Sequence, residues 1–87
     1  MYARQYSELY ETYLDSKSAW DESWRNSAFS AEYLLSLTAD ELRGLKGELN
    51  ELVERWRERS SAAREAGDVE GRENVAVHMN GFPFRTA

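Results

Sequence analysis

The stretch TADELRGLKGELNELVERWRER, which begins at Thr38, restricts the fold more than any other part of the chain. Thr38 and Glu41 have the spacing of a capping box, in which each side chain accepts a hydrogen bond from the other residue's backbone N–H. Behind this signal, apolar residues recur in steps of three and four, as one face of a helix requires. They are Leu42, Leu45, Leu49, Leu52 and Trp56, with Val53 beside them. The sequence therefore predicts an amphipathic helix over about residues 39–64.

The opposite face of this predicted helix is expected to be solvated, because it is rich in charge. Its members are Arg43, Lys46, Glu48, Glu51, Arg55 and Arg59. Gly44 and Gly47 interrupt the helix, and each costs roughly 1 kcal/mol relative to alanine. Two interpretations stay open: packing simply tolerates these glycines, or they allow the backbone of a second subunit to approach closely.

A second apolar stripe lies near the N-terminus and predicts a helix over about residues 2–23. Its residues follow helical spacing: Tyr2, Tyr6, Leu9, Tyr13 and Trp20, widened by Tyr10 and Leu14. No capping residue precedes this pattern, so we expect the natural helix to begin further upstream.

Two segments show the period-two alternation of half-buried strands. The first is FSAEYLLSL, over about residues 29–37, and the second covers about residues 74–80 around Val75, Val77 and Met79. We expect Pro83 to lie where the second strand ends, because proline cannot donate to a ladder. The order helix–strand–helix–strand predicts one α+β domain over residues 1–87, with two amphipathic helices packed on a two-stranded sheet in a small two-layer α-β-α-β arrangement. Neighbouring strands would be parallel, with a right-handed crossover.

Composition excludes several classes of function. The chain has no cysteine, a formal net charge of −5 and no apolar run approaching the roughly 18 residues of a membrane span. We therefore expect a cytoplasmic protein that does not enter the membrane. Direct DNA binding is disfavoured, because neutralised phosphates supply most of the affinity of DNA-binding domains. His78 has no second histidine or cysteine with which to hold a metal. Because nucleophile-elbow and phosphate-loop motifs are also lacking, we expect no catalytic residue, no cofactor and no metal, so not an enzyme.

The aromatic content is high, with three Trp, five Tyr and three Phe. Aromatic side chains bury large areas, so these residues form either a dense core or a surface for a partner. We expect a homodimer, with an interface formed by Tyr2, Tyr6, Leu9, Tyr13 and Trp20. A candidate pocket for a small apolar effector comprises Tyr10, Trp24, Tyr33 and Trp56.

The order of these motifs resembles the C-terminal half of actinobacterial ArsR-like winged helix-turn-helix transcriptional regulators. In that family an aromatic helix precedes a pattern such as F-S-x-x-x-L-x-L-T-x-E-E-L-x-x-L and a closing valine-rich strand with Phe-Pro. The matching residues are Phe29, Ser30, Leu35, Leu37, Thr38, Glu41, Leu42, Leu45, Val75, Val77, His78, Phe82 and Pro83.

The resemblance implies a dimerisation or regulatory module of a helix-turn-helix regulator that reads DNA only through a winged-helix half not present in this sequence. No residue matches a recognition helix, and the family's metal ligands have no counterparts. Two alternatives remain: a module that binds a small hydrophobic or aromatic effector, and a free-standing acidic adaptor for protein–protein interaction. The segment from Phe82 to Phe84 either anchors the end of the sheet or docks on a partner.

Overall fold

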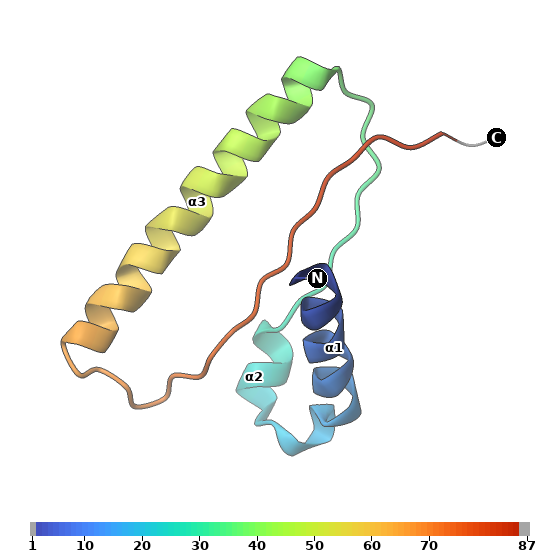
Figure 1. The fold of residues 1–87 in the computed structure, drawn as a ribbon. Helices are drawn as coiled ribbons and strands as arrows, with labels where there is room; N and C mark the ends of the chain where they lie inside the picture. Colours follow the sequence, from blue (N-terminus) through green and yellow to red (C-terminus); the bar gives the residue numbers. More distant parts are fainter. Residues whose placement is uncertain (1, 86–87) are drawn as a thin grey trace. The chain divides into compact units, whose positions relative to one another are not determined.

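The computed structural model describes the backbone of residues 2–85, with the side chains of residue 5 and residues 7–85. Four helical elements follow in order: α1 (Tyr2–Asp15), the 3₁₀ helix η1 (Lys17–Ala19), α2 (Glu22–Ser27) and α3 (Ala39–Glu65) (Figure 1). The chain divides into two compact units. The first comprises Met1–Leu34 and Val75–Met79, and the second comprises Leu35–Asn74 and Asn80–Ala87.

The predicted α+β fold is wrong, because residues 2–85 contain helices and no strand. Both predicted strands, 29–37 and 74–80, are free of regular structure, and neither forms a ladder of backbone hydrogen bonds in the described part of the chain. The alternation of apolar and polar residues predicts which side chains would share a face of a strand. It does not show that a second strand lies beside the segment in register. A two-stranded sheet is marginal in water even when it is well formed. The first segment is open to solvent, with Phe29 79% and Tyr33 80% exposed.

The helix predicted over residues 2–23 is also wrong in extent, because α1 ends at Asp15. The hydroxyl of Ser16 donates to the carbonyl oxygen of Thr12 at 2.9 Å, and the Ser16 N–H is shared between the carbonyls of Thr12 and Tyr13. Such local serine bonds compete with the helical ladder. After η1, Trp20 adopts an extended conformation with φ −91° and ψ 148°. Trp20 therefore lies outside α1, and the predicted stripe does not continue along one helix.

α2 is a short helix whose ends are defined by hydrogen bonds within the first unit. The carbonyl of Asp21 accepts from the N–H groups of Trp24 and Arg25, and the N–H of Ala28 donates to the carbonyl of Trp24. Beyond Ala28, which is itself extended, the chain continues without regular structure as far as Thr38.

α3 begins at the predicted capping box, which is confirmed. The Thr38 hydroxyl accepts from the Glu41 N–H at 3.0 Å, and a Glu41 carboxylate oxygen accepts from the Thr38 N–H at 2.9 Å. These two bonds satisfy donors that a helix N-terminus otherwise leaves unpaired. α3 then runs to Glu65, against a predicted end near residue 64.

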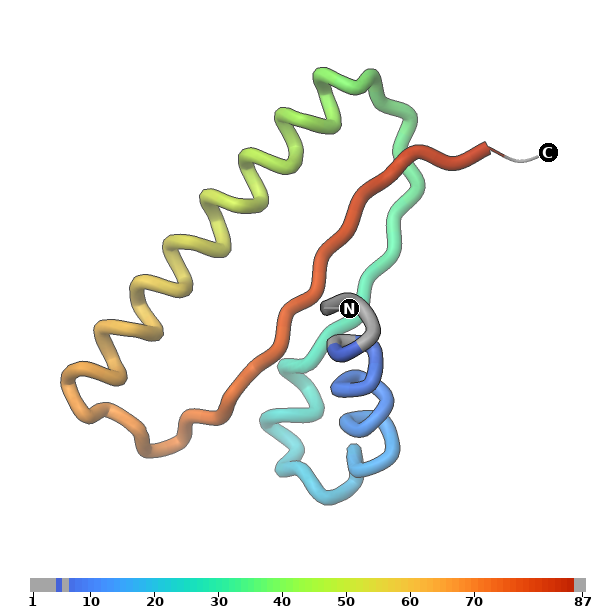
Figure 2. Tube along the Cα trace, viewed as in Figure 1, coloured from blue at the N-terminus to red at the C-terminus, as the bar shows by residue number. Residues whose placement is uncertain are grey.

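The C-terminus of α3 is closed by a Schellman motif, traced in Figure 2 where the helix gives way to the C-terminal segment. The N–H of Asp68 donates to the carbonyl of Ala63 at 2.9 Å, and the N–H of Gly67 donates to the carbonyl of Arg64 at 3.1 Å. This geometry needs a left-handed residue, and Gly67 supplies it with φ +75°. The helix therefore has a defined stop as well as a defined start.

No side chain in the described part of the chain is fully buried. In the second unit, the best-shielded positions are half-buried and lie on one side of α3: Leu42, Leu45, Leu49, Val53 and Ala63. In the first unit, the half-buried positions are Tyr13, Ser16, Trp20, Trp24 and Arg25. None of the helices in the described residues has the length and apolar character that crossing a membrane requires.

Candidate interaction surface

α3 presents an apolar side along its length, and we call it the α3 seam. It consists of Leu42, Leu45, Leu49, Leu52 and Trp56. The seam is open towards its C-terminal end, where Leu52 is 43% and Trp56 is 58% exposed. At its N-terminal end the chain returns, because a Cβ built on Gly81 would lie 3.5 Å from a methyl carbon of Leu42. The C-terminal segment thus shields one end of the seam.

Arg59 belongs beside the seam, although the sequence interpretation placed it on the solvated face. Its guanidinium carbon lies 4.3 Å from the centroid of the Trp56 ring, within the range of a cation–π contact. The i, i+3 spacing of Trp56 and Arg59 in the sequence indicates this contact, because residues three apart on a helix are neighbours.

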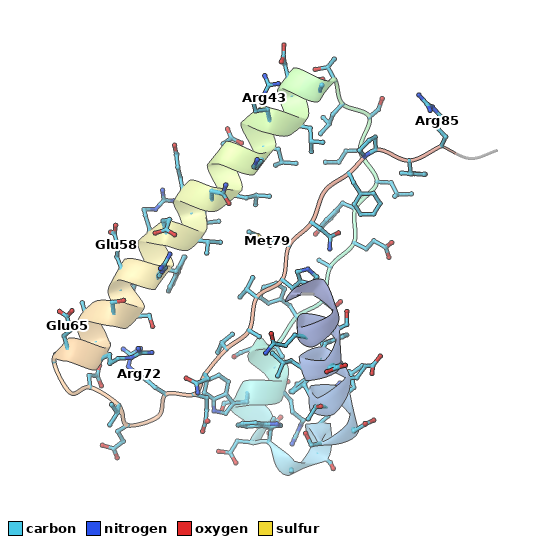
Figure 3. All side chains as sticks on the ribbon, viewed as in Figure 1. Arg43, Glu58, Glu65, Arg72, Met79 and Arg85 are labelled. Atoms are coloured by element: carbon cyan, nitrogen blue, oxygen red, sulfur yellow. The ribbon has the colours of Figure 1, made fainter. Side chains whose placement is uncertain are left out.

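The remaining charges of α3 pair locally or face solvent. Arg43 contacts Asp40 at 2.8 Å and Arg57 contacts Glu54 at 2.9 Å, both as exposed i, i+3 ion pairs. Figure 3 shows Arg43, Glu58 and Glu65 projecting outward from the helix. Exposed pairs of this kind contribute little to stability, typically below about 1 kcal/mol. The charges therefore keep the outer surface of α3 solvated, and the seam remains its apolar side.

Gly44 and Gly47 have no atom of another part of the chain near them. A Cβ at either position would meet nothing within 4 Å. Within the described residues, then, no backbone approaches α3 at these glycines.

The first unit carries an aromatic pair beside α2 and exposed apolar residues on α1. The rings of Trp20 and Trp24 meet edge to face, with centroids 6.2 Å apart and planes at 60°. An Arg25 guanidinium N–H donates to the carbonyl oxygen of Trp20, which links α2 to the turn that precedes it. Leu9, Tyr10 and Leu14 of α1 are exposed.

Tyr13 contributes an unusual polar group to the first unit. Its hydroxyl oxygen is shielded from solvent and has no hydrogen-bond partner in the described part of the chain. A shielded hydroxyl without a partner costs roughly 1–3 kcal/mol. α1 therefore carries a polar group whose hydrogen bond is not supplied by the described residues.

The predicted dimer-interface residues are distributed over two elements. Leu9 and Tyr13 lie on α1, whereas Trp20 lies beyond η1 and packs on Trp24. The side chains of Tyr2 and Tyr6 lie outside the described residues. Leu9 is exposed and Tyr13 and Trp20 are half-buried, so these three remain accessible to a partner.

The predicted effector-pocket residues are divided between the units, with Tyr10, Trp24 and Tyr33 in the first and Trp56 in the second. Tyr10 and Tyr33 are exposed, Trp24 packs on Trp20, and Trp56 carries Arg59 on its ring. A shallow, largely open depression lies among the described residues of each unit. The first is lined by Leu14, Asp15, Lys17, Ser18 and Arg25, and the second by Ser60, Arg64, Asp68, Val69, Arg72, Glu73 and Asn74. None of the four predicted residues lines either depression.

Reactive chemistry is sparse in the described residues, where no three His, Cys, Asp or Glu side chains lie close enough together to hold a metal ion. His78 is engaged in an interaction rather than free. Each unit therefore offers its own candidate interaction surface: the α3 seam in the second unit, and the exposed apolar and aromatic residues of α1 and the Trp20–Trp24 pair in the first. Comparison with protein-family models, with curated proteins and with solved structures finds no match to this chain.

Proposed function

We propose that this chain is a dimerisation module, which obtains its hydrophobic core by pairing with a second copy of itself. The single observation that carries the proposal is that no described side chain is fully buried, although the chain is rich in Leu, Trp, Tyr and Phe. Large apolar side chains left in water lose the main favourable term of folding. Association is the direct way to recover it.

We assign this module to the regulatory half of a winged-helix transcription regulator acting in the cytoplasm. This part of the proposal is supported by the motif order around Phe29–Leu45 and Val75–Pro83 described above. In such a regulator, a twofold interface would hold two DNA-reading domains at the spacing of operator half-sites. Its test is the gene itself: an in-frame winged helix encoded upstream is expected, and an unrelated upstream sequence would exclude this assignment.

Sedimentation equilibrium over low to high micromolar concentration tests the dimerisation itself. The expected result is a species of twice the chain mass of 10.1 kDa, with a melting temperature that rises with protein concentration because folding and association are coupled. A strictly monomeric species with a concentration-independent, cooperative melt would contradict the proposal.

A paired substitution on α1 tests the predicted interface residues. Leu9→Asp places a charge on the exposed apolar stripe and is expected to weaken dimerisation at least tenfold, since a charge in an apolar interface is costly. Thr12→Asp adds the same charge to α1 at an exposed position, about 130° around the helix from the middle of the stripe that Leu9, Tyr10 and Leu14 define. It serves as the matched control and should leave the dimer unchanged. Equal effects of the two substitutions would remove α1 from the interface.

A further inference from the structure

α3 has the pattern of a short two-stranded coiled coil. Its 27 residues span about 40 Å, and the α3 seam follows the 3–4 spacing of core positions. In heptad notation, Leu42, Leu49 and Trp56 take position a, and Leu45, Leu52 and Arg59 take position d. Gly44 and Gly47 fall at the outer positions c and f, which agrees with the open space around them.

We propose that α3 pairs with α3 of a second copy in the antiparallel sense, about a twofold axis that passes between Asn50 and Glu51. Leu49 then packs against the partner's Leu52, and Leu45 against the partner's Trp56. This inference rests on the proposed self-association and adds to it the helix, its direction and its register. The Leu42 end of the seam, where Gly81 approaches, lies beyond these central layers.

Charge complementarity supports this register. Glu48 and Arg55 both occupy position g, along the same edge of the seam. Antiparallel helices bring their g positions together, so Glu48 faces the partner's Arg55, and the twofold axis repeats the pair. Neither residue forms an ion pair inside the described part of its own chain. Both are therefore available for contacts across the axis.

The parallel arrangement is disfavoured by the position of Arg59. It would place Arg59 in a core layer against the partner's Arg59, whereas the antiparallel register sets Arg59 opposite the partner's Leu42 in the outermost layer. The one favourable pair it offers joins Glu41 to the partner's Lys46. However, the Glu41 carboxylate already accepts the Thr38 N–H in the capping box. In the antiparallel register Arg59 stays at the end of the seam, stacked on Trp56.

Distances between spin labels distinguish the two directions. The chain has no cysteine, so Ser61→Cys, at the exposed outer position f, provides a single nitroxide site on each full-length chain. In the antiparallel register, the two labels lie about 30 Å apart along the helix axis. In a parallel pair they lie side by side, within about 20 Å, because packed helices are only 8–10 Å apart. Pulsed dipolar spectroscopy measures this distance directly.

The outcomes separate the register from the self-association on which it rests. A dimer by sedimentation with one distance of 30 Å or more supports the pairing. A dimer with a short distance, or with a broad distribution, overturns the register but leaves the dimerisation module standing. A monomer, including one that binds only a different protein, overturns both.

A charge reversal tests the cross-axis ion pairs independently of the labels. Glu48→Arg sets like charges against the partner's Arg55 twice and is expected to weaken dimerisation by about tenfold. Combining it with Arg55→Glu restores opposite charges and should recover most of the affinity. Glu58→Arg makes the same change at outer position c and serves as the control. If the double variant is no tighter than Glu48→Arg alone, the proposed register is wrong.

Discussion

The guanidinium of Arg59 covers the ring of Trp56 from one turn further along α3, with 4.3 Å between the guanidinium carbon and the ring centroid. Trp56 has the largest side chain of the α3 seam, and this side chain is 58% exposed. A cation over one face of the ring shields part of it, while the seam stays open at this end.

This contact is expected to contribute about 0.5–1 kcal/mol to the free energy of unfolding, as exposed cation–π pairs do. A double-mutant cycle of Arg59→Ala and Trp56→Leu isolates the interaction, since effects of independent residues would simply add. Chemical denaturation followed by circular dichroism supplies the four free energies. Additive effects would show that the two side chains are neighbours without being coupled.

The capping box gives a second prediction. Thr38→Ala removes the acceptor for the Glu41 N–H and is expected to lower the free energy of unfolding by about 1 kcal/mol. Thr38→Ser keeps the hydroxyl and should stay within a few tenths of a kcal/mol of the parent. Helical circular dichroism during thermal unfolding measures both variants. Equal losses in the two would mean that the methyl group, rather than the hydroxyl, matters at this position.

Replacing Gly67 or Gly44 of the second unit by alanine should change the free energy of unfolding in opposite directions. Gly67 has φ +75° in the Schellman motif, so Gly67→Ala is expected to cost about 1–2 kcal/mol. Gly44→Ala adds a methyl group in open space within a helix and should stabilise by up to about 1 kcal/mol. Denaturation midpoints report both changes.

Gly44→Ala also tests the earlier alternative in which a second backbone packs against this glycine. If Gly44→Ala weakens dimerisation in sedimentation, a partner backbone must approach α3 there. The antiparallel register, which places Gly44 on the outer side, predicts no such loss.

Tyr13 offers a prediction on α1. Tyr13→Phe deletes the shielded hydroxyl that lacks a partner in the described residues, so the variant should be as stable as the parent or more stable by up to about 1 kcal/mol. Tyr10→Phe, at an exposed position of the same helix, is the control and should be neutral. A loss of more than 1 kcal/mol for Tyr13→Phe would show that a second chain supplies the missing hydrogen-bond partner.

The sequence was informative where the determinants of structure are local. The capping box and the seam of α3 require only residues within one or two turns of each other, and both are present in the structure. The end of α1 was missed because Ser16 bonds back to Thr12, a local competition that the aromatic spacing concealed. Arg59 was misplaced because charge, rather than spacing to Trp56, guided its assignment.

The prediction of a two-stranded sheet failed for a different reason. Residues 29–37 have the alternation of a strand, but pairing depends on another segment whose register no local pattern encodes. The predicted interface residues Leu9 and Trp20 share this difficulty, since they can be recognised as apolar without any indication of what covers them.

If the chain pairs as proposed, the lack of any fully buried side chain in the described residues would link the protein's lifetime to its abundance. When copies are scarce, most chains would be single, and proteases would act on the fraction that is open. As copies accumulate, mass action would shift them into pairs that resist cleavage. The proposed pairing would thus set a threshold concentration, below which the protein is cleared and above which it persists.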